Sequence, residues 1–136
     1  MYLKETFNYD ILSNPSDNCI RIEIYDNLNK KYFFFAINKN MFLINNRYNH
    51  KLNIRGNSSE EQMKNLINKL NLITSSWKLV YQNGGEYYWG LTICNNNNCS
   101  LYVGNSISIE NWSEFISVIN NSVEDLMNNV IKDTLI

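Results

Sequence analysis

The sequence has 136 residues, of which 44% are hydrophobic and 18% charged, and its formal net charge is −1. This length and composition are typical of one globular domain with a single hydrophobic core. The 12 lysines and arginines are scattered, which disfavours a nucleic-acid binder because neutralised phosphates supply much of the affinity of such proteins.

The sequence also argues against a membrane or secreted protein. No run approaches the roughly 18 apolar residues that a membrane-spanning helix needs. The N-terminus, MYLKETFNYD, contains acidic residues and lacks the apolar core of a signal peptide. Three cysteines, an odd number, then favour reduced thiols and a cytoplasmic location.

The first half of the chain predicts three strands. Apolar and polar residues alternate over residues 2–12 and again over 20–25, which is typical of half-buried strands. The almost continuously apolar run at 32–37, YFFFAI, predicts a central strand covered on both faces. Residues 41–44 either extend that strand or form a short extra one. The polar residues 45–57 predict a loop.

A helix follows and ends near Ile73. Either Ser58 with Glu61 or Ser59 with Gln62 would form a capping box, which satisfies amide donors at the start of a helix. Apolar residues then recur at helical spacing and predict one buried stripe: Met63, Leu66, Ile67 and Leu70.

The second half repeats this order, starting with a strand at Trp77. Residues 83–85, Asn-Gly-Gly, predict a hairpin turn, and residues 95–98 predict another turn before a last strand at 99–103. Between the two turns the side chains alternate between faces. One face carries Tyr87, Trp89, Leu91 and Ile93, and the other Tyr88, Gly90, Thr92 and Cys94.

The last helix is expected to begin near Asn111, whose side chain would cap it, with Glu114 three residues later. The apolar positions that follow keep helical spacing over five turns, which predicts one buried face. They are Trp112, Phe115, Ile116, Ile119, Val123, Leu126, Met127, Val130 and Ile131.

Together these elements predict a single α+β domain over residues 1–136, made of two β-β-β-α halves at 1–74 and 75–136. Six mostly antiparallel strands with two helices packed on one face are the natural arrangement. The other face of such a sheet stays half open. Aromatic side chains left on that open face would form a binding surface.

The cysteines and the single histidine suggest no chemical site. Cys94 and Cys99 flank a turn, so they are candidates for half of a zinc site or for a disulfide. A structural zinc needs four ligands, and only Cys19 and His50 remain, without partners at metal spacing. We therefore expect buried thiols, a solvated His50, and no metal, cofactor or Cys–His nucleophile pair.

Several motifs between residues 58 and 120 are arranged as in a widespread family of small bacterial α+β domains, which this region resembles. The shared pattern is a capped helix, a Trp, a W-x-L/I-x-I hairpin, a G-x-N element and a terminal helix that opens with Asn-Trp. The chain departs from it at Ser108-Ile109, where the family has Pro, and at Gly84-Gly85, where it has Asp-Gly. The resemblance implies the architecture and no activity. The matching positions are Trp77, Trp89, Leu91, Ile93, Tyr102, Gly104, Asn105, Asn111, Trp112 and Phe115.

A surplus of aromatic residues and the lack of a chemical site predict a non-enzymatic protein-binding module. Its 26 asparagines indicate a low-GC genome, so we expect a bacterial or phage inhibitor that occludes a toxin or host protein, of the immunity-protein or anti-CRISPR type. The expected contacts lie on the open strand face and the Asn-rich turn: Tyr88, Tyr102, Asn96 and Asn97. We expect a monomer or homodimer.

Two other classes of function stay open. A nucleic-acid or nucleotide binder would stack bases on the aromatic residues of the open sheet face. An enzyme of unrecognised type would need a deep pocket that holds Cys94, Cys99 or His50 with a carboxylate nearby.

Overall fold

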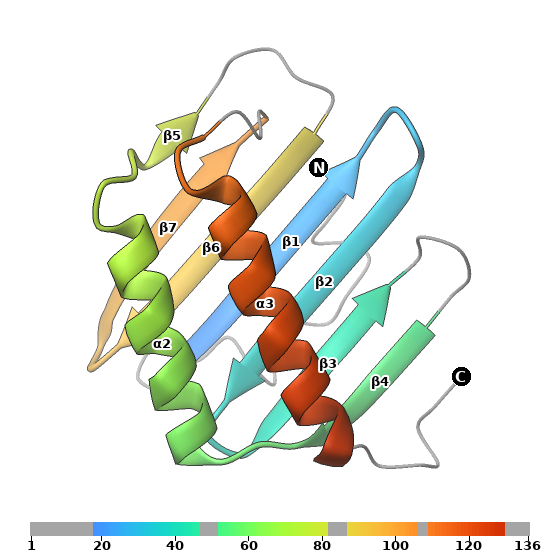
Figure 1. Ribbon diagram of the computed structural model, residues 1–136, viewed down its shortest axis with the longest axis vertical. Coiled ribbons are helices and arrows are strands. Elements are labelled where there is room, and N and C mark those ends of the chain that lie inside the picture. Colours follow the sequence, from blue (N-terminus) through green and yellow to red (C-terminus); the bar gives the residue numbers. More distant parts are fainter. Residues whose placement is uncertain (1–17, 47–51, 82–86, 106–108, 130–136) are drawn as a thin grey trace.

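Strand β1 (Cys19–Asp26) lies in the middle of the sheet around which the chain folds. The computed structural model of the protein describes residues 18–46, 52–81, 87–105 and 109–129. Within these residues, seven strands form one sheet in the order β4-β3-β2-β1-β6-β7-β5 (Figure 1). Neighbouring strands are antiparallel, except that β5 and β7 are parallel.

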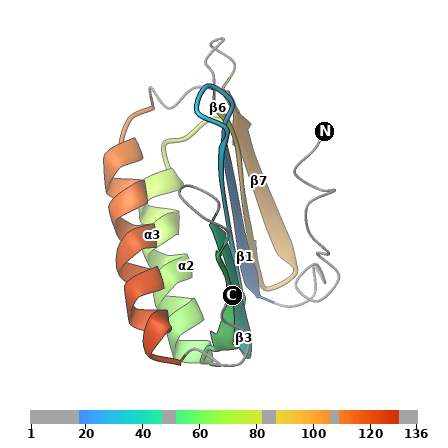
Figure 2. The same cartoon turned by 90° about the vertical axis from the view of Figure 1, so that its right-hand side faces the viewer.

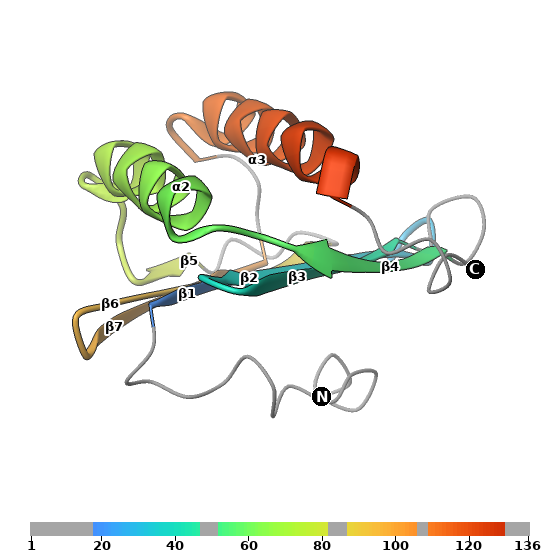
Figure 3. The same cartoon turned by 90° about the horizontal axis from the view of Figure 1, so that it is seen from below.

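Two α-helices of the described residues, α2 (Glu60–Thr74) and α3 (Trp112–Leu126), lie side by side on one face of the sheet (Figure 2). Seen from below, both helices lie on the same side of the strands (Figure 3). The prediction of an α+β domain with a mostly antiparallel sheet is therefore confirmed. The other elements are β2 (Lys31–Asn38), β3 (Met41–Asn46), β4 (Leu52–Asn57), β5 (Val80–Tyr81), β6 (Tyr87–Asn95), β7 (Asn98–Gly104) and the 3-10 helix η2 (Met127–Asn129).

The main core fills the space between the sheet and the helices. In β1, Ile20, Ile22 and Ile24 face the helices, and the residues between them face away. Burying a large apolar side chain contributes roughly 1.5–3 kcal/mol, so this layer supplies most of the favourable free energy of folding. All but two of the buried helix residues fall on the two predicted stripes, and the two others, Ile73 and Thr74, end α2. The buried stripe residues are Met63, Leu66, Ile67 and Leu70 of α2, and Phe115, Ile119 and Leu126 of α3.

Strand β2 is buried on both faces, as its apolar run predicts. Phe35 and Ile37 join the core under the helices. Tyr32, Phe34 and Ala36 form a second buried cluster on the opposite face of the sheet.

The expected loop at 45–57 is wrong in part, because residues Leu52–Asn57 form strand β4 beside β3. Residues Met41–Asn46 also form a separate strand, β3, so four described strands precede α2 and the sheet has seven described strands rather than six. An edge strand pairs on one side only and tolerates polar side chains, so its sequence resembles that of a loop. Ile54, buried opposite Ile44, ties β4 to the core.

The strand expected from Trp77 differs from its prediction. Within the described residues 77–81, only Val80 and Tyr81 pair, and they do so parallel to β7. Trp77 itself is buried, and its indole Nε1 donates a hydrogen bond to the carbonyl oxygen of Glu110 at 3.1 Å. Trp77 therefore joins the end of α2 to the start of α3 instead of contributing to the sheet.

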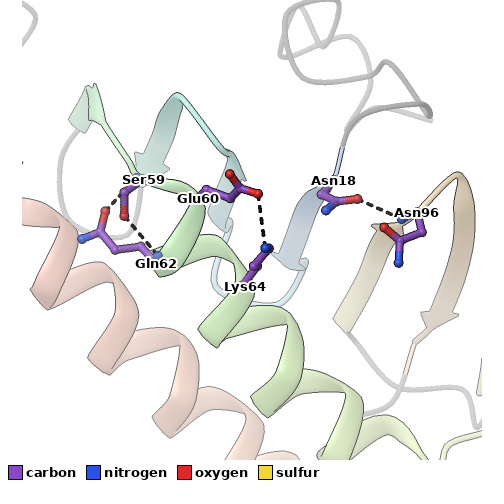
Figure 4. Close-up of polar contacts among 6 residues, drawn as sticks. All are labelled: Asn18, Ser59, Glu60, Gln62, Lys64 and Asn96. Carbon is purple, nitrogen blue, oxygen red and sulfur yellow. Dashed lines mark hydrogen bonds and ion pairs between the residues drawn. The ribbon is translucent and has the colours of Figure 1, made fainter.

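Helix α2 begins with the second of the two predicted capping boxes. The amide of Gln62 donates to Ser59 Oγ at 3.1 Å, and the amide of Ser59 donates to Gln62 Oε1 at 3.0 Å (Figure 4). One turn later, Lys64 Nζ lies 3.3 Å from a carboxylate oxygen of Glu60 (Figure 4). This exposed pair contributes only about 0.3–0.5 kcal/mol.

Helix α3 starts differently from its prediction. Asn111 holds the N-cap position with a left-handed φ of 66° and makes no side-chain capping bond, so the predicted cap is wrong. The reason is conformational, because a capping side chain acts from an extended backbone. Val130, Ile131, the expected strand at 2–12 and the hairpin turn at 83–85 lie outside the described residues.

Candidate functional site

The β6–β7 hairpin carries all four residues expected to contact a partner. Its strands are joined by Asn96 and Asn97, whose φ angles are 54° and 68°. Asparagine tolerates this left-handed conformation better than most residues, and two such residues in succession fit the twist of an antiparallel hairpin. The amide of Asn96 also donates to Asn18 Oδ1 at 2.9 Å, which ties the turn to the start of β1 (Figure 4).

The two faces of β6 follow the predicted alternation. Trp89, Leu91 and Ile93 are buried in the core under the helices. Tyr88 faces the other way and is 40% exposed. The prediction of which residues share a face is therefore confirmed for this strand.

Tyr102 does not share a face with Tyr88. In the hairpin it pairs with Leu91, which points to the helices, so Tyr102 lies on the helix-covered face. Its ring centroid is 5.9 Å from that of Trp77, which also packs against Trp89 at 5.7 Å. Tyr102 thus packs the hairpin against the core on the helix-covered face. The two tyrosines lie on opposite faces of the sheet and cannot belong to one flat contact surface.

Apart from Cys94 and Cys99 at the end of the hairpin, the positions of β5, β6 and β7 that face away from the helices form one continuous surface, which we call the outer strip. Three of its side chains are well exposed: Val80 at 51%, Tyr88 at 40% and Leu101 at 55%. Outward positions of a half-covered antiparallel sheet are ordinarily polar. The outer strip contains no charged residue; it consists of Val80, Tyr88, Gly90, Thr92, Leu101 and Val103.

Polar groups border this strip on two sides. On the neighbouring strand β1, Arg21 lies opposite Thr92, and Glu23 lies opposite Gly90. The exposed turn of Asn96 and Asn97 closes one end of the hairpin. An apolar centre with a polar rim is the usual anatomy of a protein–protein interface.

Cys94 and Cys99 form a disulfide, so the expectation that all three cysteines are thiols is wrong. The two-residue turn places these cysteines directly opposite each other, with their Cα atoms 4.0 Å apart. Cys19 is buried and keeps its thiol. Because disulfides are typical of oxidising compartments, the bridge gives no support to a cytoplasmic location, which stays a prediction.

A shallow cavity of about 150 Å³ lies between α2 and α3. Its volume is below the roughly 300–1,000 Å³ of ordinary ligand pockets. Gln62 Nε2 donates to Asp125 Oδ2 at 3.1 Å within its wall, so part of its polar lining is already satisfied. The lining residues are Ile37, Gln62, Asn65, Leu66, Lys69, Asn121, Ser122, Asp125 and Leu126.

Chemical groups elsewhere in the described residues do not converge on a site. Across residues 18–46, 52–81, 87–105 and 109–129, no three His, Cys, Asp or Glu side chains are placed to hold a metal ion. His50 lies outside this part of the chain. No helix there is long and apolar enough to cross a membrane.

No protein-family model matches this chain, and no curated protein matches it. The resemblance of residues 58–120 to a bacterial α+β family therefore stays a prediction. The function must be argued from the surface geometry of the chain itself.

Three residues of the outer strip escaped the sequence prediction: Val80, Leu101 and Val103. The sequence could have placed two of them on the outer face, because a turn at 96–97 sets Leu101 opposite Thr92 and Val103 opposite Gly90. No sequence pattern could have placed Val80 there, since its position follows from the parallel pairing of β5 with β7.

Proposed function

We propose that the protein is a non-enzymatic binding module that recognises a partner protein through the outer strip. The supporting observation is the exposure of Val80, Tyr88 and Leu101 on adjoining strands without any charged side chain among them. Exposed apolar residues that lie together on a rigid sheet are typical of interaction sites.

Tyr88 is the natural anchor of this contact. Its side chain combines a large apolar ring with a hydroxyl, and such residues dominate the energetics of interfaces. Asn96 and Asn97 at the end of the hairpin would add hydrogen bonds at the polar rim. Tyr102 would act indirectly, by holding β7 against the aromatic core through its contact with Trp77.

The partner that fits best is a protein with an apolar patch of its own. We infer an inhibitor that occludes a toxin or host protein, in the manner of an immunity protein or an anti-CRISPR protein. A nucleic acid is less well supported, because its phosphates require cations and the outer strip has none.

The decisive experiment is a pull-down from nuclease-treated host lysate with three forms of the tagged protein: wild type, Leu101→Asp and Leu72→Asp. Leu72 is 80% exposed on α2, on the opposite side of the sheet, so it serves as a matched leucine control. We expect wild type and Leu72→Asp to recover the same stoichiometric protein, and Leu101→Asp to lose it. A hot-spot loss of about 2 kcal/mol or more corresponds to roughly a 30-fold rise in Kd.

Equal recovery by all three forms would contradict the proposal, because the contact would then lie elsewhere. Recovery only from lysate that keeps its nucleic acid would favour the nucleic-acid alternative. Gel filtration of wild type and Leu101→Asp separates a further case, in which a second copy of the chain covers the outer strip.

A further inference from the structure

Cysteines occupy matching positions in three neighbouring strands. Cys19 of β1 lies directly opposite Cys94 of β6, and Cys94 lies directly opposite Cys99 of β7. All three fall on the face away from the helices, because their strand neighbours Ile20 and Ile93 belong to the core under the helices. The three residues therefore form a row across the sheet, which we call the cysteine row.

Cys94 has a bridging partner on each side. Directly opposite residues of antiparallel strands have Cα atoms about 4.5–5.5 Å apart. That interval lies within the roughly 4.4–6.8 Å over which disulfides form. The register of β1 with β6 thus places Cys19 within bridging distance of Cys94 without any change in strand pairing.

The order of the row also suits the exchange reaction. A thiolate attacks one sulfur of a disulfide, and the other sulfur leaves from the far side of the attacked atom. In the cysteine row the attacking group Cys19, the central Cys94 and the leaving group Cys99 follow one another across adjacent strands.

We propose that the cysteine row is a thiol–disulfide exchange site in which Cys94 moves its bridge between Cys99 and Cys19. The Cys19 thiol loses its proton, and its Sγ bonds to Cys94 Sγ while the Cys94–Cys99 bond breaks. Cys99 leaves as a thiolate and takes up a proton. One disulfide and one thiol are present before and after, so no oxidant or reductant is consumed.

The exchange changes which thiol solvent can reach. Cys19 is 2% exposed and Cys94 is 4% exposed, whereas Cys99 is an exposed residue. Bridge transfer therefore carries the reactive thiol from the interior to the surface, two residues from Leu101 of the outer strip. The attacking Cys19 thiol is buried and has little access to solvent, so the exchange is slow and an alkylating agent will trap its product at the exposed Cys99. This inference does not depend on the proposed function.

The test is a non-reducing incubation of the folded protein with N-ethylmaleimide, followed by tryptic mapping at neutral pH with the maleimide kept in excess, so that no thiol remains to rearrange the bridge during digestion. Cleavage sites put Cys19 in the peptide 5–21, and Cys94 with Cys99 in the peptide 79–132. We expect one maleimide on Cys99 and a disulfide that joins the two peptides. Label on Cys19 with the 79–132 peptide still bridged internally overturns the proposal, and so does the absence of label.

Two variants make the result independent of labelling rates. In a glutathione redox buffer, Cys99→Ser is expected to form the Cys19–Cys94 disulfide, and the proposal fails if both cysteines stay reduced. Cys94→Ser is the matched control: it leaves Cys19 and Cys99 two strand spacings, or roughly 9–10 Å, apart, so no internal bridge is expected. A bridge in this control as complete as that in Cys99→Ser would show that strand register does not select the pair, and would also overturn the proposal.

Discussion

The face of the sheet away from the helices has two apolar regions that differ in exposure. In β2, Tyr32, Phe34 and Ala36 are 5%, 1% and 0% exposed. On the outer strip, Tyr88 and Leu101 are 40% and 55% exposed, although they too are outward residues of paired strands. The comparison shows that an apolar pattern assigns a residue to a face and does not determine whether that face is covered.

The two regions therefore differ in what they do for the protein. Each buried aromatic of β2 removes apolar surface from water on folding and contributes to stability. The outer strip leaves its apolar side chains in water, so the favourable free energy of burying them becomes available only when something else covers the strip. Substitutions in β2 should change folding, and substitutions in the outer strip should change binding.

The largest expected effect is a difference in stability between two truncation variants, one in each region. Phe34→Ala should lower the free energy of unfolding by about 3–5 kcal/mol, because it leaves a cavity among buried side chains. Leu101→Ala should change it by no more than about 0.5 kcal/mol, as expected for an exposed site. Urea denaturation measures both. Similar losses in the two variants would remove the distinction between the regions.

Two glycines allow the covered face and the outer strip to be compared by the space that each leaves for a side chain. A Cβ at Gly104 would lie 2.8 Å from the ring carbon Cζ2 of Trp89 and 2.8 Å from the backbone oxygen of Tyr81. The backbone cannot move aside cheaply, so Gly104→Ala should cost about 1–3 kcal/mol by overpacking.

Gly90, on the outer strip, is the matched control in the partner strand. The nearest atoms to a Cβ there are 3.9 Å away, so Gly90→Ala should be neutral or stabilise by about 0.4–1 kcal/mol through the unfolded chain. Thermal unfolding of the two variants is the measurement. A loss at Gly90 equal to that at Gly104 would mean that strand conformation, and not the neighbouring ring, limits both positions.

The smallest effect is expected at the turn that leads from β1 into the buried strand β2. The side-chain amide of Asn29 donates to the Asp26 carboxylate at 2.8 Å, and the Asn29 backbone amide donates at 3.2 Å. The side-chain bond is the main reason that the pKa of Asp26 lies below its usual range. A carboxyl group whose pKa is lowered by folding stabilises the folded protein at pH values above its pKa in the unfolded chain, which is about 3.9 for Asp. This stability is lost as the pH falls through the folded pKa.

Asp26→Asn should therefore be less stable than wild type at neutral pH. The difference in the free energy of unfolding between the two proteins should shrink as the pH falls below about 4. Asn29→Ala removes the side-chain donor and should show part of the same pH dependence. Urea denaturation at pH 7, 5 and 3 follows both variants. A gap that does not change with pH would mean that the Asp26 charge does not contribute.

Local rules predicted several parts of the molecule correctly. One of the two predicted capping boxes, the stripe of α2 and the two faces of β6 follow from chain neighbours, because cap and side-chain periodicities act over a few residues. The stripe of α3 is correct in part, since Phe115, Ile119 and Leu126 are buried and Met127 is 39% exposed. The same rules failed at Asn111, where a left-handed backbone removes the side-chain cap. They also failed at β4, whose polar residues pair only because the edge of β3 lies beside them.

The sequence by itself determined the class of the fold, the positions of both helices and the pairing across the turn of Asn96 and Asn97. Only the tertiary structure decided that Tyr102 packs on Trp77 while Tyr88 meets solvent, and that Cys19 lies beside the bridged Cys94. Spacing along the chain specifies local geometry. Exposure and contacts between distant strands depend on which surfaces meet when the sheet and the helices pack together.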